Sequence, residues 1–236
     1  MDIREEKMRY QILTEVFEPL LGHPFPKLWG KKKWIQLDLS RDNTELPRNK
    51  AMDLPALQSY IDGCLEEQTA FGAWGGYAER RDIYRRSEVF ATDAKKESDD
   101  YRNVHLGIDF WLPAGTAVHA PLPGVVHSFR DNAESGNYGP TIILLHEIGN
   151  IRIHSLYGHL SRRSLEGLHK GKLIRRGEAF AELGEVHENK DWPPHLHFQL
   201  IYKMQGHKGD YPGVCTEREA EAYLKNCPDP MRFFSW

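Results

Sequence analysis

From residue 105 onward the sequence is a succession of short apolar runs separated by turn residues. These runs are typical of β-strands, in which successive side chains alternate between two faces: TAVHA, GVVHSF, TIILLHE, IRIHSLY, AFAEL and HLHFQLIY. Turn-forming pairs such as Pro123-Gly124, Gly139-Pro140 and Gly149-Asn150 interrupt them. The sequence therefore predicts a mainly β fold, a compact and mostly antiparallel sheet domain over residues 104–205.

Helical patterns precede this segment. Apolar residues recur at three- and four-residue steps between residues 13 and 21, and Gly22 with Pro24 then provides a stop signal. A second helix is indicated by Asp53 as cap, Pro55 in the first turn and an apolar stripe from Leu54 to Leu65. We expect a partly helical N-terminal region over residues 1–75 and a connector over residues 76–103.

The C-terminal tail, residues 206–236, predicts one more short helix. Thr216 and Glu219 have the spacing of a capping box, and Pro228 marks the end of the helix.

Charge and composition exclude several classes of protein. The net charge is −3 without a basic stripe, so we expect no nucleic-acid partner, and we interpret the lysines at 31–33 as a solvated turn. The N-terminal residues contain neither a secretory apolar segment nor a membrane span. The three cysteines are widely spaced, which fits a reducing compartment. We therefore expect a cytoplasmic protein, and the sequence leaves its oligomeric state open.

The run HLHFQLIY places polar side chains that could bind a metal or catalyse a reaction on one face of a strand. Alternation puts His195, His197 and Gln199 on the face opposite to Leu196 and Phe198. Two imidazoles on one face are suited either to share a metal ion or to place one on the ion and one beside it. A solvated strand face that happens to carry histidines is the ordinary alternative.

The run HLGID contributes a third histidine and a carboxylate. In a straight strand His105 and Asp109 would lie about 13 Å apart, too far to share an ion. Gly107 lies between them and allows the chain to bend. A third segment, YGHLS, holds His159 where an alternating strand ends.

The sequence excludes several common catalytic motifs. It contains no HExxH, no GxSxG nucleophile elbow, no P-loop and no dinucleotide-binding GxGxxG. The remaining histidines have no partner at ligand spacing and are interpreted as structural or solvent-facing: His23, His119, His127, His146, His154, His169, His187 and His207.

Taken together, HxGxD, YGHLS and HLHFQ resemble the lysostaphin-type zinc metallopeptidases, the LytM or M23 family. GTAVHAPLPGVV and GKLIRRGEAFAELG are also similar to family segments, and the resemblance covers roughly residues 104–202. It implies one zinc ion per chain, bound by His105, Asp109 and His197, with His159 and His195 as catalytic groups beside it. Which of these two histidines is the general base stays open, and Tyr157 is a further candidate proton donor.

The resemblance implies a zinc-dependent endopeptidase that hydrolyses an amide bond in a short peptide, with cell-wall-derived peptidoglycan fragments among the candidate substrates. The alternative is a metal-stabilised peptide-binding or regulatory module without hydrolysis. Trp192-Pro193-Pro194 forms a bulkier approach to HxH than the usual glycine-rich one. GGYAERRDIY and WPPHLHFQ resemble a branch that includes modules joined to kinase-like and aminotransferase-like domains. We interpret the arginine-aromatic stretch 71–90 as a packed connector or as a wall of the substrate groove.

Overall fold

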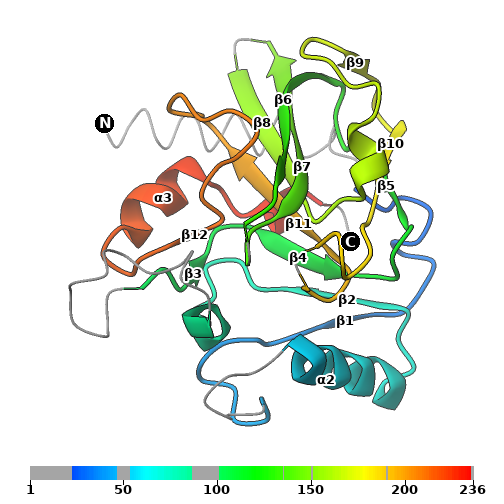
Figure 1. Ribbon diagram of the computed structural model, residues 1–236, viewed down its shortest axis with the longest axis vertical. Helices are drawn as coiled ribbons and strands as arrows, with labels where there is room; N and C mark the ends of the chain where they lie inside the picture. The colour runs from blue at the N-terminus through cyan, green and yellow to red at the C-terminus, as the bar shows by residue number, and fades with distance from the viewer. Residues whose placement is uncertain are drawn as a thin grey trace.

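The computed structural model describes residues 23–46, 54–86, 101–134, 136–149, 151–189 and 191–234. Its main feature is one eight-stranded sheet (Figure 1). In spatial order the strands are β1 (Trp34–Gln36), β2 (Gly72–Gly75), β4 (Ile108–Trp111), β11 (His195–Ile201), β8 (Ile151–Gly158), β7 (Gly139–Ile148), β6 (Gly124–Asn132) and β9 (Leu173–Ile174). Only the β1–β2 pair is parallel, so the predicted mainly β, mostly antiparallel fold is confirmed.

Two small ribbons and several short helical segments complete the described fold. β5 (Ala117–His119) pairs with β10 (Ala179–Glu182), and β3 (Val104–His105) pairs with β12 (Val214–Cys215). The α-helices are α2 (Leu54–Glu67) and α3 (Ala220–Asn226). The 3-10 helices are η2 (Asp82–Arg86), η4 (Arg162–Leu165) and η5 (Pro230–Phe233).

The predicted helices have different outcomes. α2 covers the apolar stripe identified in the sequence and buries Leu54, Leu57 and Ile61. The predicted capping box forms in the turn that leads into α3, since the Glu219 amide donates to Thr216 Oγ1 and the Thr216 amide to Glu219 Oε2, both at 3.3 Å. The helix predicted for residues 13–21 and the proposed cap Asp53 lie outside the described residues.

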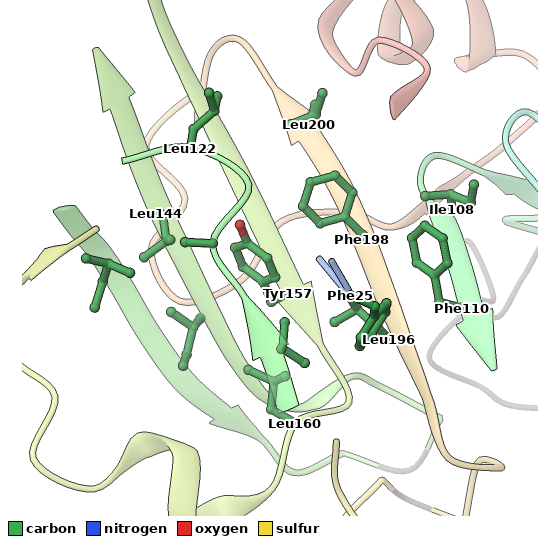
Figure 2. Packing of buried hydrophobic residues seen from close by; sticks show 14 of the residues in the cluster. Phe25, Ile108, Phe110, Leu122, Leu144, Tyr157, Leu160, Leu196, Phe198 and Leu200 are labelled. Atoms are coloured by element: carbon green, nitrogen blue, oxygen red, sulfur yellow. The ribbon is translucent and has the colours of Figure 1, made fainter. Parts of the chain in front are cut away.

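The central strands separate an apolar core from a polar face. On one face Leu196, Phe198 and Leu200 of β11 pack with Ile108 and Phe110 of β4 (Figure 2). Burying each such side chain stabilises the fold by about 1.5–3 kcal/mol. The alternate residues of the same strands point to the opposite face, because side chains alternate along a strand. The packing of the core thus fixes the direction of the functional side chains.

The sheet continues into the segment before residue 76. β2 pairs with β4 so that Gly75 lies opposite Asp109, and β1 adds a further strand at the edge. α2 packs below this edge (Figure 1), in a cluster that contains Leu57, Trp111 and Trp192. The exposed lysines at 31–33 lie in a turn before β1, as expected. No helix among the described residues is long and apolar enough to span a membrane.

Candidate metal centre

His105, Asp109 and His197 come together on the polar face of the sheet. The break between β3 and β4 at residues 106–107 removes the separation that a straight strand would impose, and Asp109 then lies directly opposite His197 in the β4–β11 ladder. All three side chains are buried. One ligand atom from each residue makes a group that could hold a metal ion.

The distances within this group fit a small divalent cation. His105 Nε2 lies 2.8 Å from His197 Nδ1 and 3.3 Å from Asp109 Oδ1, while His197 Nδ1 lies 3.2 Å from Asp109 Oδ1. Ligand atoms bound at about 2.0–2.1 Å in a tetrahedral site lie about 3.3 Å apart. The three atoms therefore have nearly the spacing of three corners of such a site.

The outer hydrogen bonds fix the tautomers of both imidazoles. His105 Nδ1 lies 2.8 Å from the Gly76 carbonyl oxygen, to which it must donate, so Nε2 carries a lone pair. His197 Nε2 donates to Gln199 Oε1 at 2.9 Å, and the Gln199 amide is oriented by its own bond to the Pro212 carbonyl. His197 Nδ1 therefore also presents a lone pair.

Electrostatics keeps His105 and Asp109 in the states that bind a metal. Burial lowers the pKa of His105 to about 4, so its imidazole is neutral at neutral pH. Burial opposes ionisation of Asp109, but His105 and Arg81 hold its pKa well below its ordinary value. Two lone pairs and an anionic oxygen thus face one another at close range. These atoms repel one another unless a cation lies among them, and their chemistry fits zinc.

His195 and His159 lie beside the three ligands. The His195 Nδ1 proton is donated to the Pro193 carbonyl at 2.7 Å, and Nε2 lies 3.9 Å from Asp109 Oδ1. The rings of His159 and His195 have centroids 4.0 Å apart. Burial lowers the pKa of each, and for His159 the neighbouring His195 adds to this effect. Both imidazoles are therefore neutral at neutral pH.

His159 has an unusual backbone conformation. Its φ of 61° is in the left-handed region, which residues other than glycine adopt uncommonly. The amide donates to the Tyr138 carbonyl, and the His159 carbonyl accepts from the Gly184 amide. Among the described residues its buried Nδ1 has no hydrogen-bond partner. Such a conformation at a cavity is typical of functional positions.

Tyr157 is not a proton donor at this centre. Its ring lies on the apolar face, between Leu144 and Phe198 in Figure 2, with its centroid 5.3 Å from that of Phe198. The expectation was wrong because Phe198 pairs directly with Tyr157 in the ladder, which places both on the core side. Burial also raises its pKa further above neutral.

The tyrosine that does lie near the centre is Tyr138, which the sequence analysis did not identify. Its ring centroid lies 5.0 Å from that of His197 and 5.8 Å from that of His159. Space for it is provided by Gly158 and Gly213, where an added Cβ would lie 2.8 Å and 1.6 Å from Tyr138 atoms. No local pattern marks Tyr138, because glycines distant in the sequence create its place.

A cavity of about 330 Å³ opens at the five predicted residues, all of which line it. Apolar and aromatic side chains continue the lining, among them Leu57, Ile83, Tyr84, Trp111 and Trp192. Ile83 and Tyr84 belong to the stretch 71–90, whose described part, residues 71–86, therefore both packs against the sheet and forms a wall of the cavity. His207 is exposed and also lines the cavity.

The fold and the site together define a class of protein. It has an antiparallel sheet that carries a buried set of two imidazoles and one carboxylate, which is suited to a divalent metal. Among models of protein families, Peptidase family M23 matches residues 103–210. This segment is therefore a domain of the M23 metallopeptidases, as its motifs indicated.

Two curated proteins and one solved structure are similar to parts of this chain. The chain is 33% identical over 99 residues to the peptidoglycan DD-endopeptidase ShyA of Vibrio cholerae, covering 42% of this chain and 20% of that protein. It is 34% identical over 97 residues to the DD-carboxypeptidase/endopeptidase Mpg of Neisseria meningitidis, covering 41% and 20%. The chain thus matches about a fifth of the length of these curated relatives. The lysostaphin catalytic domain of Staphylococcus simulans aligns with a TM-score of 0.38 at 23% identity, covering 56% of this chain and 79% of that one.

Proposed function

We propose that this chain is a zinc-dependent peptidase that hydrolyses an amide bond in a short peptide, with one zinc ion held by His105, Asp109 and His197. The observation that carries the proposal is the convergence of three unprotonated ligand atoms separated by 2.8–3.3 Å. Zinc bound there would polarise the substrate carbonyl and acidify water, which makes hydroxide available near neutral pH.

His195 is proposed as the general base. Its Nδ1 proton is committed to the Pro193 carbonyl, which supports a fixed tautomer with a lone pair on Nε2. In this role Nε2 accepts a proton from the attacking water and delivers it to the leaving amine as the C–N bond breaks. Trp111 supports the ring orientation, since it stacks on His195 with centroids 6.0 Å apart.

His159 is proposed as the group that stabilises the carbonyl oxygen as it gains negative charge. Its imidazole lies against His195 and lines the same cavity, and its Nδ1 has no partner among the described residues. A hydrogen bond donated to the developing oxyanion is stronger in the transition state than in the ground state, which is the requirement for catalysis.

For the substrate we propose a peptide of the kind found in peptidoglycan. The relatives named above are a peptidoglycan DD-endopeptidase and a DD-carboxypeptidase/endopeptidase, which supports this class. A substrate bound in the cavity would also contact aromatic side chains close to the reacting histidines. Trp192 lines the cavity, and its ring centroid lies 6.3 Å from that of His195.

The test combines metal analysis with a cleavage assay. The purified chain is analysed for zinc and incubated with cross-linked peptidoglycan peptides and a panel of linear peptides, and products are identified by mass spectrometry. We expect one zinc ion per chain and cleavage that stops with a chelator and returns with zinc. The alternative, a peptide-binding module without hydrolysis, would instead be established if the chain binds zinc and peptides raise its thermal stability but remain uncut. A chain that binds no zinc would refute both proposals.

A further inference from the structure

The segment of residues 76–84 reaches the metal centre from outside the family match, which begins at residue 103. It follows β2, whose Gly75 pairs with Asp109. This pairing brings the segment against the backs of two proposed ligands.

The contact to His105 is made by the backbone. The Gly76 carbonyl accepts the Nδ1 proton of His105 and so sets its tautomer. Gly76 has a φ of +98°, and a Cβ there would lie 1.8 Å from Arg81 Nη2. Glycine is therefore required both by its conformation and by the space that the guanidinium fills.

The contact to Asp109 is made by the side chain of Arg81. Arg81 is 3% exposed, and its Nη1 donates to Asp109 Oδ2 at 2.6 Å and to the Tyr84 hydroxyl at 3.1 Å. Its Nε donates to Glu79 Oε2 at 2.5 Å. Burial opposes its charge, but Tyr84, Glu79 and Asp109 together raise the pKa of Arg81, so the guanidinium remains charged.

Glu79 holds this arginine in place. Its second oxygen, Oε1, accepts from the Leu39 amide at 3.1 Å, so the carboxylate is anchored to the chain that follows β1. The charge of Glu79 also offsets that of Arg81. A cation near Asp109 Oδ1 is therefore repelled less than it would be by an isolated guanidinium.

We propose that Arg81 is a positioning residue for the metal centre. Its guanidinium occupies Asp109 Oδ2 and leaves only Oδ1 free to bind the metal, and Glu79 holds Arg81 in place for this role. The inference rests on the proposed zinc site. An ionised carboxylate without such a partner offers two oxygens and can bind an ion through both. The fixed fork of the guanidinium prevents this, and outer hydrogen bonds of this kind set ligand orientation.

The test uses the full chain with Arg81→Met. Zinc affinity is measured by competition with a chromophoric chelator, and coordination by the visible spectrum of the cobalt-substituted protein. We expect zinc affinity to fall about 10- to 100-fold. We also expect the intense bands of four-coordinate cobalt to weaken, because Asp109 gains freedom to bind through both oxygens. The matched control is Arg80→Met, which removes the neighbouring arginine and only the half-exposed ion pair with Glu217.

Two milder variants keep the proposal testable if Arg81→Met does not fold. Arg81→Lys retains the charge but not the fork, and Glu79→Gln weakens the hold on the guanidinium. Both are expected to give smaller changes in the same direction. Wild-type zinc affinity and cobalt spectra in all folded Arg81 and Glu79 variants would overturn the inference and leave the zinc site intact. Failure of the wild type to bind zinc would instead refute the proposed function.

Discussion

At the scale of single residues, the metal centre depends on neighbouring groups that restrict the orientation of its ligand side chains. Tyr138 and Gly107 both lie close to the His197 ring. A Cβ at Gly107 would lie 2.7 Å from His197 Nε2 and from the Phe198 carbonyl oxygen. Gly107 therefore has two functions: it permits the bend between His105 and Asp109, and it makes room for the third proposed ligand.

The first prediction concerns Gly107→Ala. The added methyl group must displace the His197 ring or the β11 backbone, so we expect unfolding free energy to fall by about 1–3 kcal/mol. Zinc affinity should fall as well, as measured by chelator competition. Gly63→Ala is the control, since its Cβ would enter open space on α2 and should stabilise the chain by about 0.4–1 kcal/mol. Unchanged zinc affinity in Gly107→Ala would contradict the close approach to His197.

The second prediction concerns His159→Asn. Asparagine tolerates the left-handed conformation at φ 61°, so folding should be preserved. The loss of the imidazole, the proposed donor to the oxyanion, should lower the rate of peptide hydrolysis about 10²- to 10³-fold while the chain retains its zinc. The exposed His169→Asn is the control and should keep the full rate. A wild-type rate in His159→Asn would exclude a catalytic role for His159.

At the scale of elements, β11 explains how much the sequence could predict. Strict alternation along HLHFQLI separates three core side chains from His195, His197 and Gln199, and this pattern is visible without a structure. Long-range pairing is not visible in the same way. The side of the sheet on which Tyr157 lies follows from its register with Phe198, and the approach of Arg81 to Asp109 follows from the β2–β4 pairing. Both depend on contacts between residues far apart in the sequence.

The third prediction tests the packing of α2 against the sheet. Leu57 is 2% exposed, packs in the cluster of Trp111 and Trp192, and lines the cavity. Leu57→Ala should therefore lower the unfolding free energy by about 2–5 kcal/mol, measured by urea denaturation. Leu173→Ala, at a side chain 60% exposed, is the control and should cost far less. Equal effects in the two variants would show that α2 does not pack as described.

At the scale of the whole molecule, neutral histidines are buried outside the metal centre as well as within it. His146 Nδ1 donates to the Pro123 carbonyl at 2.9 Å, and its Nε2 lies 2.6 Å from Ser155 Oγ. His23 stacks on Trp29 with centroids 4.0 Å apart. Burial lowers the pKa of His146 to about 4 and that of His23 to about 3. Folding therefore excludes protons that the unfolded chain binds below pH 6.5.

The fourth prediction is that stability falls on acidification. Because the pKa of His146 is lower in the folded state than in the unfolded state, its contribution is complete above pH 6.5 and is lost as the pH falls toward 4. A shift from 6.5 to about 4 corresponds to about 3 kcal/mol. His146→Gln removes this titration, so the decline of unfolding free energy between pH 7 and 4.5 should be shallower than in the wild type. The measurement uses urea denaturation of metal-free protein, so that release of zinc does not contribute. Parallel pH profiles would show that His146 is not held neutral by burial.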